Sequence, residues 1–510
     1  MTPPVDDVFA AFITSVSIYS LFTHMNHRIY PLDRIAITMM VVLTILIGLI
    51  IMGGDHAVPI VRDFSWQEKR VGMEDTAFIL SFNRTMDWPK VEENLTLTPE
   101  LPGKLSWSGR RLAYTLTEPM PYGTEFKVQL SQVEEVGLSP TAQPKVMQPF
   151  SGTFRSRDRA YAYIGVNGEE SGRLILQNLT QDQKTILTPA DLVVTEFKPY
   201  PYGDRILFSA TAKRLVSEGE FNPKLYTVTT GLQTNPPDLN NSSQQPPGEI
   251  EEVLDNQRYQ ILKFDLALDG SRIVVQRALK EGAGLGQVSL WQLPTGKSIQ
   301  LLEKVEGGNF LIAPDSRSLV IAQGQGLAIL PLEGSVNDQP LEFLPKFGMV
   351  LSFARDGSAA TMLKFNPDFT KSLFLVTTQG QQTELLKTSG SILRATFDPK
   401  QRLLYCLLTQ VSAGEEYVEI PYLATIDLAT QKETRLLNLP NQRDTTMALA
   451  PDGSALLFDQ AIEASPDYPE SSQTNQNGSV TTSNLWILPL DSSNQQPSSV
   501  GSGIDPQWLP

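Results

Sequence analysis

The stretch "LAPDGSALLF" (449–458) decides the fold, because similar stretches recur along the chain. A short apolar run precedes its Pro-Asp-Gly turn, and a second apolar run follows. Proline fixes φ, aspartate accepts a backbone N–H and glycine tolerates a positive φ, so the tripeptide suits a tight turn between two strands. Related stretches stand at 197–208, 266–275, 312–321, 353–362 and 397–406. A reactive site would be expected once, whereas every repeat needs a turn. Asp452 is therefore predicted to be a turn residue and not a catalytic one.

A second element, a strand that ends in a polar turn, follows each copy. These strands stand at 225–231, 289–296, 327–334, 373–380, 422–430 and 485–491, and an earlier one at 173–180 makes seven. The chain ends in "GIDPQWLP" (503–510), which is like the beginning of the first element, while "RAYAYIGV" (159–166) is like its second strand. We expect these two halves to complete one repeat. Such closure removes the exposed edges of an open sheet.

The repeats predict an all-β fold over 158–510, a seven-bladed β-propeller closed by the C-terminal strand, with six or eight blades as alternatives. The Pro-Asp-Gly-Ser turn and the strand–turn elements such as "SLWQLPTG" (289–296) resemble those of TolB-like and WD-type bacterial propellers. This resemblance implies the fold and leaves the function open, since propellers serve binding, scaffolding and catalysis alike.

Three low-complexity segments interrupt the propeller repeats, at 234–249, 464–483 and 491–503. Proline, glutamine, asparagine and serine dominate them, so they cannot bury much apolar surface. We expect them to be spacer loops on one rim, with contact to a partner as the alternative.

Residues 58–157 alternate between short apolar runs and turn signals, which predicts a β-sandwich. The segment from 82 to 130, together with "PFSGTFRSR" (149–157), resembles the SbsA-type bacterial Ig-like domain. The matching positions are Phe82, Asn83, Met86, Asp87, Pro99, Gly103, Trp107, Gly123, Thr124 and Phe154. The resemblance implies an extracytoplasmic spacer or adhesion module. Met86 and Trp107 are expected to pack in its core.

Residues 35–52, "IAITMMVVLTILIGLIIM", contain no charged side chain. At about 1.5 Å per residue a helix of this length spans roughly 27 Å, close to the hydrocarbon core of a bilayer. Arg28 and Arg34 precede the run, so residues 1–34 are predicted to be a cytoplasmic segment, 35–52 one transmembrane helix and the remainder extracytoplasmic.

Two alternatives concern this anchor. A cleaved signal peptide is disfavoured, because a cut after Ala57 would place Asp55 at the third position before it. Met25 is an alternative start, which would leave a short basic segment before the anchor.

Composition narrows the function. The chain has 56 acidic and 41 basic residues and a net charge of −15, which repels phosphate backbones, so no nucleic-acid partner is expected. His24, His27 and His56 all precede residue 58, and Cys406 is the single cysteine. Histidine-dependent triads and the usual zinc sites are therefore excluded from 58–510. We predict no catalytic, cofactor-binding or metal-binding residue, although paired carboxylates stay possible.

These observations predict a non-enzymatic, membrane-anchored binding or scaffolding protein of the bacterial cell envelope. Its propeller would be a platform for a protein or a cell-envelope polysaccharide, on the periplasmic side of the plasma membrane. The alternative is a carboxylate-based glycan hydrolase with its site in the propeller channel. A purely structural spacer is the third possibility.

Overall fold

The computed structural model describes two compact units, Met1–Pro59 and Ile60–Pro510. The described residues are 31–52, 58–136, 144–234, 245–281, 284–324, 326–333, 342–412, 417–439, 445–463, 473–474, 480–491 and 496–510. In the first unit, helix α2 (Pro31–Met52) covers the apolar run. Within the described part of the chain, however, no helix has both the length and the apolar character needed to cross a membrane. The transmembrane helix predicted over 35–52 is therefore not confirmed. Residues 1–30, 235–244, 464–472, 475–479 and 492–495 lie outside the described residues. The segment 491–503 was expected to be a spacer loop, but its residues from 498 onward belong to strand β36 (Ser498–Trp508), which pairs with its neighbours through backbone hydrogen bonds.

Two four-stranded sheets form a β-sandwich at the start of the second unit. Their strand orders are β1-β3-β6-β5 and β2-β8-β7-β4. The strands are β1 (Val61–Phe64), β2 (Arg70–Val71), β3 (Ala77–Phe82), β4 (Leu95–Thr98), β5 (Gly103–Ser108), β6 (Arg111–Leu116), β7 (Glu125–Leu130) and β8 (Phe150–Ser156). A short helix, α3 (Trp88–Asn94), precedes β4.

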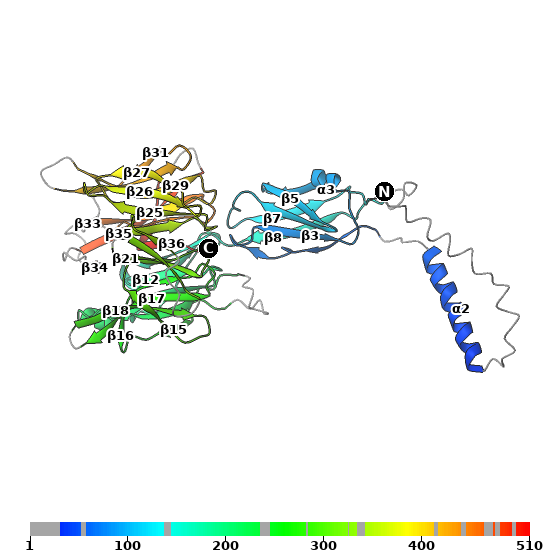
Figure 1. Ribbon diagram of the computed structural model, residues 1–510, viewed down its shortest axis with the longest axis horizontal. Coiled ribbons are helices and arrows are strands. Elements are labelled where there is room, and N and C mark those ends of the chain that lie inside the picture. The colour runs from blue at the N-terminus through cyan, green and yellow to red at the C-terminus, as the bar shows by residue number, and fades with distance from the viewer. Residues whose placement is uncertain are drawn as a thin grey trace. The chain divides into compact units, whose positions relative to one another are not determined.

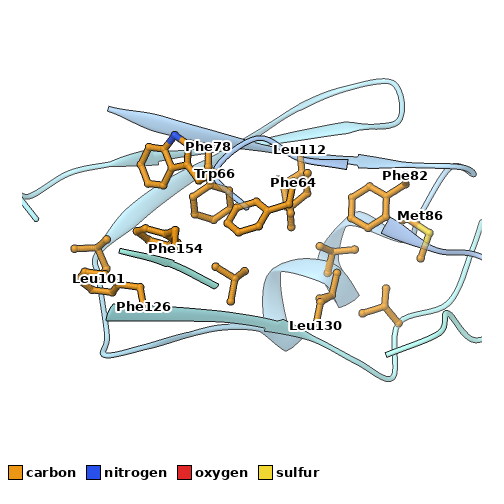
Figure 2. Packing of buried hydrophobic residues seen from close by; sticks show 14 of the residues in the cluster. Phe64, Trp66, Phe78, Phe82, Met86, Leu101, Leu112, Phe126, Leu130 and Phe154 are labelled. Atoms are coloured by element: carbon orange, nitrogen blue, oxygen red, sulfur yellow. The ribbon is translucent and has the colours of Figure 1, made fainter. Parts of the chain in front are cut away.

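Aromatic side chains fill the space between these two sheets. β7 reads "EFKVQL" and alternates between exposed and buried residues, so one of its faces points into the core. Phe78, Phe126 and Phe154 are almost fully buried, and the rings of Phe126 and Phe154 stack with centroids 5.1 Å apart (Figure 2). Met86 is buried and Trp107 packs against the same cluster, as predicted.

From residue 160 onward the chain forms antiparallel sheets in sequence order. Five have four strands each, in the orders β12-β13-β14-β15, β16-β17-β18-β19, β20-β21-β22-β23, β24-β25-β26-β27 and β28-β29-β30-β31. Their bounds are β12 (Leu192–Pro199), β13 (Arg205–Ala212), β14 (Lys224–Thr229), β15 (Ile250–Leu254), β16 (Tyr259–Leu266), β17 (Arg272–Glu281), β18 (Gly284–Pro294), β19 (Gln300–Glu306), β20 (Phe310–Ile312), β21 (Ser318–Gln323), β22 (Gly326–Pro331), β23 (Glu342–Leu344), β24 (Met349–Phe353), β25 (Ala359–Phe365), β26 (Lys371–Thr377), β27 (Gln382–Thr388), β28 (Ile392–Phe397), β29 (Leu403–Val411), β30 (Glu419–Asp427) and β31 (Glu433–Asn438). A five-residue helix, α4 (Lys213–Ser217), follows β13.

The last strand of the chain joins its first repeat to its last. An eight-stranded sheet has the path β11-β10-β9-β36-β35-β33-β32, with β34 paired to β35. Its strands are β9 (Ala160–Gly165), β10 (Leu174–Asn178), β11 (Gln183–Ile186), β32 (Met447–Leu449), β33 (Ala455–Glu463), β34 (Gln473–Thr474), β35 (Val480–Pro489) and β36 (Ser498–Trp508). The first half of β36 pairs with β35, which is labelled near it in Figure 1, and the second half pairs with β9. The pairing predicted between 503–510 and 159–166 is confirmed.

Among the described residues of the ring, seven hydrophobic clusters each lie between one sheet and the next, so together they hold the sheets in a closed ring. Pairs that share a cluster are Ala162 with Phe208, Leu207 with Phe264, Val274 with Phe310, Val320 with Met362, Leu363 with Leu404, Leu407 with Phe458, and Leu457 with Trp508. The last pair connects the final sheet to the first. The fold is thus mostly β and has the closed ring of a propeller.

The repeated turns have the conformation that their sequence predicts. Gly453 has a φ of +75°, and the Asp452 carboxylate accepts the N–H of Ser454 at 3.0 Å. The Asp356 carboxylate likewise accepts the N–H of Ser358 at 2.9 Å. Asp452 therefore closes a turn, as expected from its recurrence.

Candidate functional site

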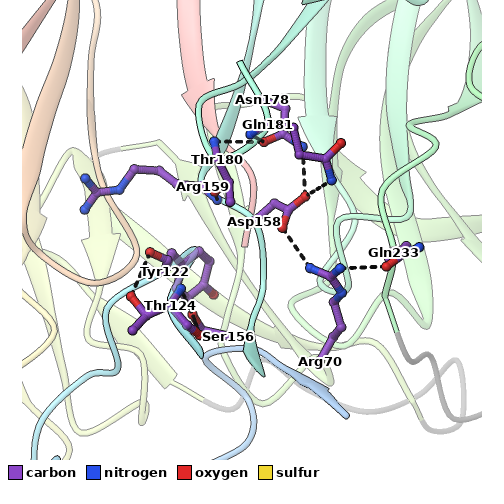
Figure 3. A network of polar contacts seen from close by, with 10 residues as sticks. All are labelled: Arg70, Tyr122, Thr124, Ser156, Asp158, Arg159, Asn178, Thr180, Gln181 and Gln233. Atoms are coloured by element: carbon purple, nitrogen blue, oxygen red, sulfur yellow. Dashed lines mark hydrogen bonds and ion pairs between the residues drawn. The ribbon is translucent and has the colours of Figure 1, made fainter. Parts of the chain in front are cut away.

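The sandwich and the ring meet at the turns that join the first and second strands of the sheets; this set of turns is called the turn face. Asp158, at the entry to the ring, accepts hydrogen bonds from Arg70 of the sandwich (2.8 Å) and from Asn178 (2.9 Å) and Gln181 (2.6 Å) of the ring (Figure 3). Asp158 is buried, so its charge needs these partners. The contact thereby fixes where the sandwich sits on the ring.

Arg157 binds both parts of this contact. Its side chain is 4 % exposed and forms an ion pair with Glu74 of the sandwich. It also donates to the carbonyl oxygens of Pro201 (3.1 Å) and Pro510 (3.3 Å), which belong to the ring. A buried arginine of this kind is costly to break once it has formed, because its partners would be left unpaired.

Two more contacts cross the same boundary. Lys400 pairs with Glu118 at 2.9 Å. The N–H of Tyr122 donates to Asp452 at 3.3 Å, and Arg159 donates to the same carboxylate oxygen at 2.8 Å. Asp452 is therefore a turn residue that also helps to hold the sandwich, which the sequence did not indicate.

A pocket of about 370 Å³ lies where the turn face meets Met73 of the sandwich. Five consecutive sheets form its wall, each with the end of its first strand and the following turn. Most wall residues are apolar, among them Leu311, Phe353 and Phe397. A concave, mainly apolar pocket with a few polar groups is the usual form of a ligand site.

The same position of the repeated turn stretch recurs five times in this wall. It is the third residue of the stretches that begin at 266, 312, 353, 397 and 449. It is occupied by Leu268, Pro314, Arg355, Pro399 and Pro451. Four of these residues are apolar, and Arg355 is charged. Aligning the repeats could have revealed Arg355 as the departure from the pattern, but only the ring shows that the five positions converge.

The carboxylates of the pocket wall are already occupied. Asp265 forms an ion pair with Lys198, and its other oxygen accepts the N–H of Ile312 at 2.7 Å. Asp398 accepts three N–H groups of its own turn, from Lys400, Arg402 and Leu403. Both groups therefore serve the fold.

Further charged residues lie along the first strands of neighbouring sheets. Burial lowers the pKa of Lys263, which donates to Asn309 and, at 3.1 Å, to the carbonyl oxygen of Phe310. Burial raises the pKa of Glu196, although Lys198 and Lys263 act in the opposite direction. Among the residues that the structure describes, no acid, histidine and cysteine cluster fit for a metal ion is found.

Asp459 is a further buried carboxylate, located where β33 meets β36. It accepts hydrogen bonds from the hydroxyl of Thr446 (3.0 Å) and from the N–H of Asp505 (2.9 Å). Burial raises the pKa of Asp459 to about 6 despite these bonds. Because Asp505 lies in β36, the bond from its N–H to Asp459 helps to hold the strand that closes the ring.

This pKa predicts a pH-dependent stability. An unfolded aspartate titrates near 4, so the folded protein binds the proton more tightly and loses stability as the pH rises from about 4 through 6. We expect the loss to be at most about 3 kcal/mol, and to be absent in D459N. Urea denaturation between pH 4 and 7 measures it.

The control variant is D356N, whose effect should have the opposite sign. Hydrogen bonds from the hydroxyl and N–H of Ser358 lower the pKa of Asp356, so this group adds stability above pH 4. Parallel pH curves for the wild type and D459N would refute the role of Asp459.

Cys406 lies inside the core between two sheets and is 1 % exposed. Burial raises the pKa of its thiol, in keeping with the inert core residue expected from its apolar neighbours.

Comparison with known proteins identifies no family for this chain. No protein-family model matches it, and no curated protein is significantly similar. Similar solved structures include TolB from Acinetobacter baumannii, with 12 % identity over 83 % of this chain and 84 % of that one, at a TM-score of 0.39. A putative 6-phosphogluconolactonase from Bacteroides uniformis shows 10 % identity over 69 % and 99 %, with a TM-score of 0.41. Prolyl oligopeptidase B from Galerina marginata shows 8 % identity over 68 % and 50 %, with a TM-score of 0.44. With TM-scores below 0.5, the propeller assignment rests on the strand order and on the closed ring of cores.

Proposed function

We propose that this chain is a binding protein and not an enzyme, with a seven-bladed propeller as the platform and the pocket beneath Met73 as its site. The pocket carries this proposal, because five repeats and the sandwich together build one apolar hollow. The sandwich, which we propose to be an SbsA-type Ig-like domain, acts in this scheme as part of the site as well as a spacer.

The occupied carboxylates favour binding over glycan hydrolysis. A glycosidase needs two carboxyl groups roughly 5 to 9.5 Å apart that are free to reach the sugar. In the pocket, Asp265 is held by Lys198 and Ile312, and Asp398 by its own turn. Neither oxygen pair is available for proton transfer without breaking the contacts that hold the wall.

The apolar wall also favours a protein partner over a polysaccharide. A sugar chain presents hydroxyl groups that need many hydrogen-bonding partners, whereas Leu311, Phe353 and Phe397 offer none. Side chains of a protein segment would gain roughly 25 cal/mol for each square ångström of apolar surface that they bury here.

We further propose that the protein works in the bacterial cell envelope, outside the cytoplasm, and that residues 35–52 hold it at the membrane. The support is the sequence: that stretch has no charged residue, and two arginines precede it. Fractionation of the cells that make the protein, before and after a carbonate wash, tests the proposal. Release of the full-length chain by the wash would speak against an anchor.

A photo-crosslinking amino acid at Leu268 tests the binding function. Leu268 is 46 % exposed and lines the pocket, so we expect the full-length protein to form a discrete adduct with one partner protein in its own cells. The same amino acid at Leu301, in β19, is the matched control, because Leu301 is also 46 % exposed and does not line the pocket. Equal adducts at both positions, or none at Leu268, would overturn the proposal.

A further inference from the structure

Arg355 differs from the other basic residues at the boundary between sandwich and ring. Arg70 is paired with Asp158, Arg157 with Glu74, and Lys400 with Glu118. For Arg355, the described residues supply no carboxylate partner; its guanidinium donates to the sulfur of Met73 at 3.0 Å. A thioether is a weak acceptor, so most of the capacity of this guanidinium is unused.

The lack of a carboxylate partner at Arg355 is unusual in a chain with this excess of acidic residues. With 56 acidic against 41 basic residues, a carboxylate partner is easily found in this protein. Glu74 is close enough to interact electrostatically with Arg355, but it is bonded to Arg157. The site therefore keeps one cation available at the wall of an apolar pocket.

The surroundings of Arg355 leave room for a ligand on two sides. A second cavity of about 210 Å³ shares Met73, Arg355 and Pro399 with the main pocket. Arg355 is an exposed side chain of the turn after β24, so an anion can reach it without moving a strand. A planar guanidinium binds a carboxylate through two parallel hydrogen bonds.

A neutral polar group in the wall, the hydroxyl of Thr396, restricts the ligand further. This hydroxyl has no partner among the described residues, whereas the Gln401 side chain is already bonded to Ser358 and Asp356. A peptide amide would satisfy the Thr396 hydroxyl, whereas an acyl chain would leave it unpaired at a cost. The pocket, at about 370 Å³, has room for a few residues of a peptide.

We propose that the pocket binds the C-terminus of an apolar peptide, with its free carboxylate on Arg355 and its side chains between the five wall turns. This ligand assignment rests on the proposed binding function, to which it adds the chemical class of the ligand. Thr396 binds the peptide backbone, and Arg355 distinguishes a free chain end from a blocked one.

The test uses the full-length protein and two fluorescein-labelled hexapeptides of alternating alanine and leucine, one with a free C-terminal carboxylate and one with an amide. Fluorescence anisotropy should show at least about tenfold tighter binding of the free acid, because a charge-assisted pair is lost in the amide. In R355Q this preference should disappear, and in R355K it should persist in part, since lysine keeps the charge without the fork.

R317Q is the matched control. Arg317 lies on the turn face in the loop after β20, is 74 % exposed on its side chain and does not line the pocket, so its loss should leave the preference unchanged. Melting curves of R355Q and R317Q establish that both are folded.

Several results would overturn the proposal. Equal binding of acid and amide would refute the carboxylate, and so would an unchanged preference in R355Q. Tighter binding of labelled dodecanoate would assign the pocket to a fatty acid instead. If crosslinking at Leu268 still captures a partner, only the ligand class has failed; if neither peptide binds and no adduct forms, the binding function has failed too.

Discussion

Removal of Gly503–Pro510 is expected to unfold the ring. These residues form the half of β36 that pairs with β9, and they carry Trp508 (7 % exposed) and Leu509 (2 % exposed). Loss of a buried tryptophan and a buried leucine costs about 3–5 and 2–5 kcal/mol respectively. The sum is comparable to the roughly 5–15 kcal/mol that stabilises a whole domain. Circular dichroism, tryptophan fluorescence and thermal denaturation of the truncated protein measure the effect.

The closure of the ring, and not chain length, should cause this loss. Removing Pro510 alone is the control, because it leaves β36, Trp508 and Leu509 in place and should change stability little. A synthetic peptide of residues 503–510, added in excess, should restore part of the native signal. A truncated protein with a native spectrum and an unchanged melting temperature would show that the closing strand is dispensable.

The part of the fold that could be predicted from the sequence depends on turn residues and short apolar runs, which act on their neighbours in the chain. Turns such as the one at Asp452 are specified by neighbouring residues, so their recurrence gave the sheets, their order and the pairing of 503–510 with 159–166. The alternation of short apolar runs and turn signals over 58–157 likewise predicted a sandwich, and strands β1 to β8 form two sheets there. Helix α3 was missed, because seven residues with a proline second are too short to show a helical period.

The site could not be predicted in the same way, because it depends on contacts between distant parts of the chain. Met73 and Arg355 are far apart in sequence, and nothing around either residue indicates the other. The Asp158 contact likewise needs Arg70 from the sandwich and Asn178 from the ring. Repeats specify their own turns, whereas the docking of a second domain on those turns is a property of the whole fold.

Arg157→Ala should separate the sandwich from the ring. Arg157 is buried, and its loss leaves Glu74 and two carbonyl oxygens without their donor. Removing one partner of such a pair typically costs about 3–5 kcal/mol. We expect a lower free energy of unfolding, two separated thermal transitions in place of a coupled one, and weaker binding at the pocket, since Met73 would no longer be held over the turn face.

Two further variants make this expectation specific to the contact. Gly72 lies so close to Arg157 that an added Cβ would stand 2.4 Å from the guanidinium carbon, so Gly72→Ala should weaken the same contact from the other side. Arg214→Ala removes an arginine whose side chain is 79 % exposed and whose pair with Glu218 lies on the surface of α4, and it should have little effect. If Arg157→Ala melted like Arg214→Ala, the buried pair would contribute nothing to docking, and the position of Met73 would have to depend on Arg70 and Asp158 alone.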